Sequence, residues 1–127
     1  MDKSVWVVDD DESIRWVLEK GLSDGGMDVQ TFDSANKVIK KLETENPHLI
    51  LKDIRMPGPS GIDLLDKVKE LRPDIPVIIM TAHSDLDSAV ESYEHGAWEY
   101  LPKPFDIEEA LSMVKRATSA DESNQEE

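Results

Sequence analysis

Polar side chains that could handle a phosphoryl group follow four separate apolar runs of the sequence. They are Asp9, Asp10 and Asp11 after the first run, Asp53 after the third, Thr81 after the fourth and Lys103 after the fifth. Crowded carboxylates repel one another unless a cation joins them, and ligands that are all oxygen suit Mg²⁺, with Mn²⁺ as the alternative. A carboxylate can attack a phosphoryl group, while a lysine and a hydroxyl stabilise the developing charge. These residue types together would suffice for metal-assisted phosphoryl transfer to an aspartate.

Each of these residues also has a simpler explanation when it is taken alone. The three aspartates could cap a helix, Asp53 could lie in a turn, Thr81 could be structural and Lys103 could be an ordinary solvated lysine. The spacing favours the joint explanation. The separation of Asp10 and Asp53 covers two strand–helix units and the later separations cover one each, on the roughly 30-residue scale of a crossover unit.

Five short runs rich in Val, Ile, Leu and aromatic residues predict strands, and helical patterns follow each of them. The predicted strands are Ser4–Val8, Asp28–Phe32, His48–Lys52, Ile75–Met80 and Ala97–Leu101, and the predicted helices are Glu12–Ser23, Ala35–Thr44, Ile62–Leu71, Asp85–His95 and Ile107–Thr118. Ser84 and Asp106 are predicted helix caps, and Gly25, Gly26 and Gly96 are predicted helix ends. The alternation predicts an α/β fold with a parallel sheet covered by helices on both faces.

A parallel sheet would gather the candidate residues at one place. The carboxyl ends of its strands meet at the same edge, and ligands bind there, where the strand order reverses. Asp10, Asp53, Thr81 and Lys103 are therefore expected to converge, although they lie far apart in the sequence.

Composition limits the classes of partner. The 127 residues suit one compact domain, and the net charge of −14 argues against direct binding of nucleic acid or of an anionic membrane surface. There are no cysteines, which fits a cytoplasmic location and excludes disulfides and thiolate sites. Residues 121–127 carry no hydrophobic side chain, so residues 1–119 are predicted to form the domain and residues 120–127 an acidic disordered tail or truncated linker.

Four segments resemble the motif blocks of a known family. VVDDDES, LKDIRMPG, PVIIMTAHSD and YLPKPF resemble the receiver domains of two-component response regulators, the CheY-like superfamily, over about residues 4–118. The stretches SIRWVL and YLPKPFDIEEA are especially similar to nitrogen-regulation response regulators of the NtrC type. The resemblance implies a flavodoxin-like (βα)₅ fold with sheet order 2-1-3-4-5. It also implies Mg²⁺-dependent aspartyl phosphorylation from a histidine-kinase phosphohistidine or a small acyl phosphate.

The resemblance assigns roles to individual positions. Asp53 matches the phospho-acceptor, Asp9 and Asp10 the acidic metal-binding pair, Thr81 the switch hydroxyl, Lys103 the phosphate-pairing lysine and Tyr100 the aromatic switch. Asp10 is the favoured direct metal ligand, and the backbone carbonyl of Arg55 would be another. Asp11 makes a run of three acids, so the register of the pair could shift by one. The peptide bond between Lys103 and Pro104 is expected to be cis.

The resemblance also implies partners and a role. The partners would be a sensor histidine kinase and an output domain or downstream protein, reached through the face formed by the fourth helix, fifth strand and fifth helix. A phosphorylation-dependent dimer is a further possibility. The implied role is control of transcription, of nitrogen-related genes in particular, by a signalling protein that catalyses its own phosphorylation and dephosphorylation and is not otherwise an enzyme. The chain lacks a GxxxxGK[ST] segment, so we expect either an excised module or a standalone receiver.

One position departs from the family pattern, and two other functions stay open. Lys52 stands beside the acceptor where closely similar proteins carry a small polar residue, and strand alternation points it to the opposite face from Asp53, where it must find a partner or reach solvent. Asp9 and Asp11 also resemble the nucleophile and acid/base of haloacid-dehalogenase-type phosphohydrolases. An inactive pseudo-receiver that only binds partners is the second alternative.

Overall fold

Five parallel strands and five helices alternate along the chain. The computed structural model describes residues 3–54, 61–82 and 85–126. The elements are β1 (Ser4–Val8), α1 (Glu12–Asp24), β2 (Asp28–Phe32), α2 (Ala35–Lys41), β3 (Leu49–Asp53), α3 (Gly61–Leu71), β4 (Val77–Ala82), α4 (Leu86–Glu94), β5 (Glu99–Lys103) and α5 (Ile107–Glu126). The strands form one sheet of order β2-β1-β3-β4-β5. This confirms the predicted fold class and strand order.

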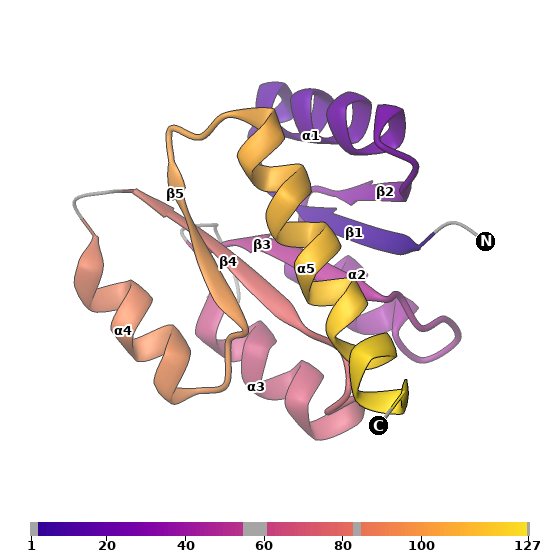
Figure 1. The fold of residues 1–127 in the computed structure, drawn as a ribbon. Coiled ribbons are helices and arrows are strands. Elements are labelled where there is room, and N and C mark those ends of the chain that lie inside the picture. Colours follow the sequence, from indigo (N-terminus) through magenta and orange to yellow (C-terminus); the bar gives the residue numbers. More distant parts are fainter. Residues whose placement is uncertain (1–2, 55–60, 83–84, 127) are drawn as a thin grey trace.

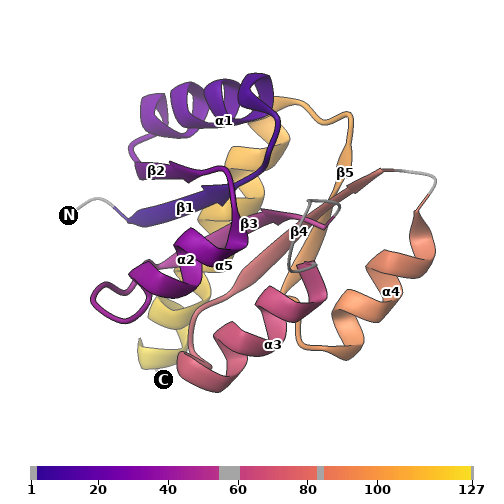
Figure 2. The same ribbon diagram turned by 180° about the vertical axis from the view of Figure 1, so that it is seen from behind.

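The helices cover the sheet from both sides. Figure 1 shows α1 and α5 on one face, and Figure 2 shows α2, α3 and α4 on the other. Alternate residues of the strands enter two separate cores. On β1, Val5 and Val7 pack with apolar residues of α1 and α5, whereas Trp6 and Val8 pack with those of α2 and α3. Because central strands are buried on both faces, they read as continuous apolar runs, which is why β1, β3 and β4 were visible in the sequence.

Local signals fix several helix ends. The carboxylate of Asp11 accepts hydrogen bonds from the Ser13 and Ile14 N–H groups and so caps the N-terminus of α1. Ser34 caps α2 in the same way. Gly26 and Gly96 have φ of 94° and 100°, a left-handed conformation that glycine adopts without strain, and they follow α1 and α4 as predicted. The predicted cap Ser84 lies outside the described residues.

The last two strands lie two residues later than predicted. β4 covers Val77–Ala82 and β5 covers Glu99–Lys103, so Thr81 and Lys103 are strand residues and do not follow the strands. β5 contains Pro102, which cannot donate a ladder hydrogen bond and therefore reads as a poor strand residue. Among the sheet pairs, β5 pairs with β4 alone, and an edge strand tolerates proline because one side of it needs no partner.

The terminal helix is longer than predicted, and α2 is shorter. α5 continues to Glu126, whereas the sequence predicted an end at Thr118 and a disordered segment from residue 120. No glycine or proline interrupts residues 119–126, so nothing in the backbone chemistry stops the helix. α2 ends at Lys41, before the predicted Thr44. None of the described helices has both the length and the apolar character that a membrane span requires.

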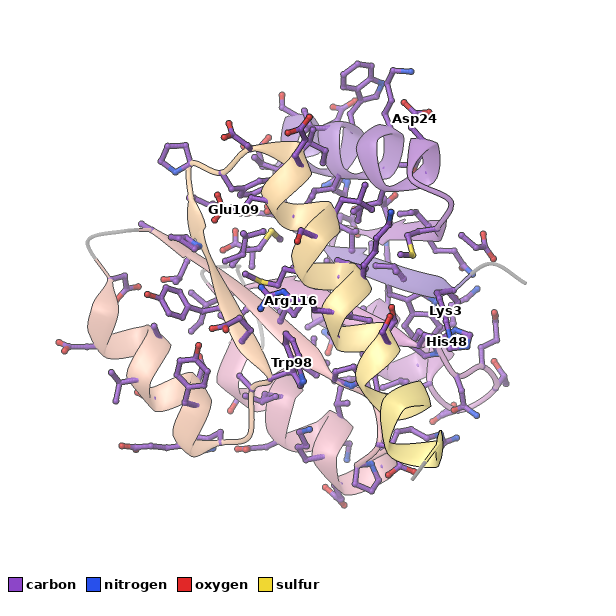
Figure 3. All side chains as sticks on the ribbon, viewed as in Figure 1. Lys3, Asp24, His48, Trp98, Glu109 and Arg116 are labelled. Carbon is purple, nitrogen blue, oxygen red and sulfur yellow. The ribbon has the colours of Figure 1, made fainter. Side chains whose placement is uncertain are left out.

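Two side-chain contacts form at the edge of the sheet where the strands begin. At the start of the strands, the Ser4 N–H donates to Nδ1 of His48 at 2.9 Å. Trp98, just before β5, lies beside α5, with the Arg116 guanidinium 6.0 Å from its ring centroid (Figure 3). Trp98 is therefore a packing residue between β5 and α5.

Candidate functional site

Three strands bring the predicted acids and lysine together. Asp9 directly follows β1, and Asp53 and Lys103 are the last residues of β3 and β5. The Lys103 ammonium donates to Asp9 Oδ2 at 2.9 Å and to Asp53 Oδ2 at 3.3 Å. This convergence at the carboxyl edge of the sheet is the one that the parallel topology predicted.

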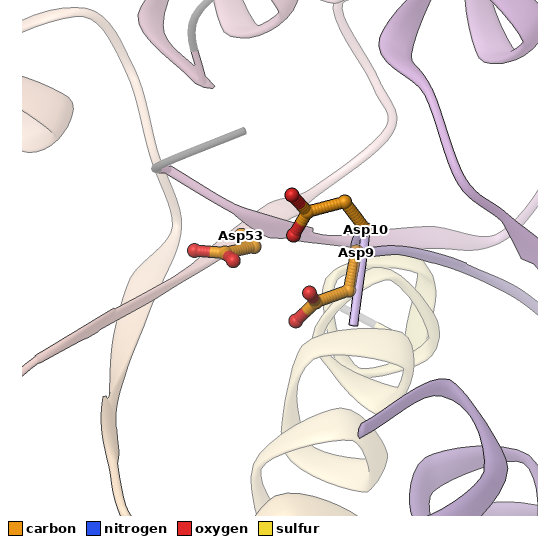
Figure 4. Close-up of side chains that lie close together, drawn as sticks. All are labelled: Asp9, Asp10 and Asp53. Carbon is orange, nitrogen blue, oxygen red and sulfur yellow. The ribbon is translucent and has the colours of Figure 1, made fainter. Parts of the chain in front are cut away.

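Asp9, Asp10 and Asp53 form an acidic cluster. One carboxylate oxygen from each lies within 4.8 Å of the others, and Figure 4 shows the three side chains side by side. Asp9 is completely buried, Asp53 is nearly so, and Asp10 is exposed. Three oxygen donors at this spacing, one of them open to solvent, fit a hard divalent cation such as Mg²⁺ that keeps several water ligands.

Burial and nearby charges act in opposite directions on the pKa values of Asp9 and Lys103. Burial is the strongest influence on Asp9 and raises the pKa of its carboxyl, although hydrogen bonds from the Asp11 N–H and Lys103 oppose this. Partial burial alone would lower the pKa of Lys103, but the hydrogen bond to Asp9 and the charges of Asp53 and Asp9 outweigh burial, and the net pKa is raised. Lys103 therefore stays cationic and compensates part of the repulsion within the acidic cluster.

Asp11 is placed differently from its two neighbours. Its carboxylate points to α1 and caps that helix, and in the described chain it is not part of the acidic cluster. Its backbone N–H donates to Asp9 Oδ1 at 2.9 Å, and Arg15 Nη1 donates to the Asp9 carbonyl at 2.7 Å. The run of three acids thus divides into two cluster members and one helix cap. The capping explanation therefore applies to Asp11, and the two acids of this run that lie beside Asp53 are Asp9 and Asp10.

Thr81 connects the acidic cluster region to α4. Thr81 follows Met80, the residue of β4 that pairs with Asp53 of β3. The Thr81 side chain is buried. The Thr81 hydroxyl donates to the main-chain carbonyl of Asp85, the residue before α4, at 3.5 Å. Thr81 therefore lies one residue beyond the strand partner of Asp53, and its hydroxyl is bonded to the start of the fourth helix.

Tyr100 lies on the outer strand against α4. Its ring meets the Tyr93 ring edge-on, with centroids 5.9 Å apart and an interplanar angle of 84°. The Tyr93 hydroxyl donates to Glu99, whose carboxylate also accepts from the Tyr100 N–H at 3.1 Å. Burial and the bond to Glu99 raise the pKa of Tyr93 to about 12. The sequence pointed to Tyr100 but not to Glu99, because nothing in the sequence distinguishes Glu99 from the other acidic residues.

Lys52 is hydrogen-bonded to the main chain of the next residue, as a buried lysine requires. The side chain is fully buried, and its ammonium donates to the main-chain carbonyl of Asp53. Burial is the largest influence and lowers the pKa of Lys52 to about 8, while the charges of Asp53, Asp9 and Asp10 act in the opposite direction. Arg55 lies outside the described residues. The Lys103–Pro104 peptide bond is cis, as expected.

The family comparison identifies this arrangement. The model of the response regulator receiver domain matches residues 5–115. The chain belongs to the response regulator receiver family. The DNA-binding transcriptional regulator NtrC of Klebsiella pneumoniae is 57% identical over 114 residues, which are 90% of this chain and 24% of that protein. NtrC of Escherichia coli strain K12 is 56% identical over 115 residues, again 24% of that protein.

Solved receiver structures agree with this assignment. The apo receiver domain of nitrogen regulatory protein C superposes with a TM-score of 0.84 at 55% identity, covering 93% of this chain and 95% of that one. NtrX from Brucella abortus gives a TM-score of 0.93 at 29% identity, covering 99% of this chain and 29% of that one. The chain is thus a response regulator receiver domain of the NtrC type. It spans about a quarter of the length of the curated relatives.

The two alternative functions are not favoured. The family match assigns the chain to receivers and not to phosphohydrolases. The geometry agrees, because the Asp9 side chain has no exposed surface, whereas 12% of the Asp53 side chain is exposed. The acids and lysine that a pseudo-receiver would lack are all in place.

Proposed function

We propose that Asp53 is the phospho-acceptor of this receiver. A carboxylate oxygen of Asp53 attacks the phosphorus of a phosphohistidine on a sensor kinase, and the phosphorus–nitrogen bond breaks. The bonding pair returns to the imidazole nitrogen, which takes up a proton, and Asp53 becomes an aspartyl phosphate. A small acyl phosphate can replace the kinase as donor. The observation that carries the proposal is the meeting of Asp53 with Asp9, Asp10 and Lys103 at one strand edge.

Asp9, Asp10 and Asp53 would hold Mg²⁺, with Mn²⁺ as an alternative and the main-chain carbonyl of Arg55 as a further ligand. The bound cation would neutralise negative charge on the transferring oxygens. Lys103 already hydrogen-bonds Asp53 and would pair with the phosphoryl oxygens from the other side. Asp11 is left out of the ligand set because its carboxylate caps α1.

The kinase would approach beside Lys103. A pocket of about 430 Å³ lies there, lined by Ile14, Val17, Lys103, Pro104 and Phe105. Trp16 next to it is 64% exposed, which is unusual for a large apolar side chain. An apolar helix surface of the kinase, placed on this pocket, would bring a phosphohistidine to the acidic cluster.

The phosphoryl group would act on α4 through Thr81. We infer that the new charge draws the Thr81 hydroxyl away from the Asp85 carbonyl, and that Tyr100 then moves into the space behind it. The equilibrium between two arrangements of α4 and β5 shifts, and the face formed by α4, β5 and α5 controls an output domain or a phosphorylation-dependent dimer. Exposed Val90 and Tyr93 on α4 are suited to such a contact.

The wider role follows from the relation to NtrC. We propose that residues 1–119 form the receiver and that residues 120–127 are a linker. The regulator would control transcription, of nitrogen-related genes in particular, in the cytoplasm. Transfer and loss of the phosphoryl group would be catalysed by the receiver's own residues, and nucleic acid would not bind to this strongly acidic domain directly.

Intact-mass measurement with acetyl phosphate tests the assignment. Wild type with Mg²⁺ is expected to gain one phosphoryl group, and the gain is expected to disappear with excess EDTA. Asp53→Asn removes the nucleophile but keeps the size of the side chain and is expected to gain none. The surface variant Asp63→Asn, in the exposed first turn of α3, is the matched control and is expected to behave as wild type. Equal phosphorylation of wild type and Asp53→Asn would refute the proposal.

A further inference from the structure

Lys52 is a buried lysine in the middle of the sheet. It precedes Asp53 on β3, and its register partners are Val8 on β1 and Ile79 on β4. Strand alternation places it on the same face as Ile50 and Ile54, which belong to the core under α2 and α3. None of its surface is exposed. Burying an ammonium group is costly unless nearby groups compensate the charge, so Lys52 needs compensation.

That compensation comes from the acidic cluster. The Lys52 ammonium turns toward the carboxyl edge of the sheet and donates to the Asp53 carbonyl. This hydrogen bond places the ammonium beside a residue whose carboxylate belongs to the cluster, so its positive charge acts on the cluster. Lys103 approaches the cluster from β5, on the face covered by α1 and α5, whereas Lys52 approaches it from the opposite face. The cluster is therefore placed between two lysines.

The second lysine changes the charge balance at this strand edge. Three carboxylates with Lys103 leave two uncompensated negative charges, which is the charge that one divalent cation neutralises. Lys52 removes one of these charges before any metal arrives. We propose that Lys52 is an internal counter-cation that stabilises the acidic cluster in the metal-free receiver and weakens its affinity for divalent cations. This inference rests on the proposed Mg²⁺ site and goes beyond it, because it concerns the strength and not the existence of binding.

The test is a MgCl₂ titration followed by tryptophan fluorescence. Lys52→Met keeps a similar side-chain length and removes the charge, and its dissociation constant for Mg²⁺ is expected to fall about tenfold, because one nearby positive charge no longer opposes the metal. Lys52→Arg keeps the charge and is expected to bind within about twofold of wild type. The matched control is Lys40→Met, an exposed residue of α2, which changes the net charge equally and is expected to leave the affinity unchanged.

Thermal unfolding gives a second measure that does not depend on phosphorylation. Saturating Mg²⁺ is expected to raise the melting temperature of Lys52→Met by more than it raises that of wild type, because tighter binding stabilises the folded state more. Unchanged or weaker Mg²⁺ affinity in Lys52→Met would overturn the inference. Lys52→Ser carries the same test if the methionine variant does not fold, and failure of both to fold would also overturn it. A wild type that binds no Mg²⁺ at all would instead refute the proposed metal site.

Discussion

The acidic cluster and the face formed by α4 and β5 hold their side chains in different ways. Asp9 and Asp53 lie at the ends of β1 and β3, which have sheet neighbours on both sides, and both are buried and hydrogen-bonded to Lys103. Tyr93, Glu99 and Tyr100 lie on a short helix and an edge strand, where their contacts are largely exposed. Because buried, multiply bonded groups open rarely and exposed contacts open readily, we expect α4 to move more easily than the cluster. A receiver needs this division, because chemistry requires fixed groups and signalling requires an element that can shift.

Removal of Lys103 should have the largest effect, since it acts on the fixed region. Lys103→Met leaves buried Asp9 without the ammonium that bonds it and removes the cation beside Asp53. The initial rate of phosphorylation by acetyl phosphate, measured by intact mass, is expected to fall roughly 100- to 1,000-fold. Lys115→Met on the exposed side of α5 is the control and should keep the wild-type rate. A loss of less than about threefold would show that Lys103 is not part of the chemistry.

The difference between Asp10 and Asp11 should be the next largest. Asp10→Asn removes a carboxylate of the acidic cluster, and its Mg²⁺ affinity is expected to fall by about tenfold or more. Asp11→Asn preserves the cap of α1, because asparagine caps helices about as well as aspartate, and should bind Mg²⁺ within about twofold of wild type. Fluorescence titration measures both. Equal losses in the two variants would contradict the division of this acidic run into ligand and cap.

Loss of the Tyr93 hydroxyl should destabilise α4 and leave the phosphorylation rate almost unchanged. Tyr93→Phe removes the hydrogen bond to Glu99 and is expected to lower the free energy of unfolding by about 0.5 kcal/mol, since the pair is largely exposed. Hydrogen exchange at α4 amides should become faster, while the phosphorylation rate stays within about twofold of wild type. A phosphorylation loss as large as that of Lys103→Met would remove the distinction between the two regions.

The smallest expected effect concerns the other end of α4. Nδ1 of His95, at the C-terminus of α4, lies 2.7 Å from Asp66 of α3, and this contact raises the pKa of His95 above its usual value. A raised pKa in the folded state means that the pair stabilises the fold at about pH 6 and that this contribution is lost as the pH rises through the folded pKa. Wild type should therefore exceed His95→Gln in urea stability at about pH 6 and not at about pH 8.5. Asp66→Asn should remove the same pH-dependent difference, and persistence of that difference would contradict the pairing.

The sequence predicted the acidic cluster better than the contacts between α4 and β5, for physical reasons. Strand order and strand ends determine where Asp9, Asp53 and Lys103 meet, and strands leave a strong apolar pattern. The end of β5 was misplaced because Pro102 lies in the strand, which an edge position permits. The contact of Tyr93 with Glu99 depends on how one helix packs on one edge strand, and no periodicity encodes it. The direction of the Lys52 ammonium depended on side-chain geometry in the same way.

Peptide mapping of the phosphorylated receiver tests the central claim most directly. Wild type would be treated with acetyl phosphate and Mg²⁺, and the acyl phosphate reduced with borohydride so that the modified aspartate survives digestion. Tandem mass spectrometry is expected to place the modification on Asp53, at the end of β3 and next to the Lys103 ammonium. A modification on Asp9 would contradict the account and would assign the nucleophile to the carboxylate that we describe as buried and committed to hydrogen bonds.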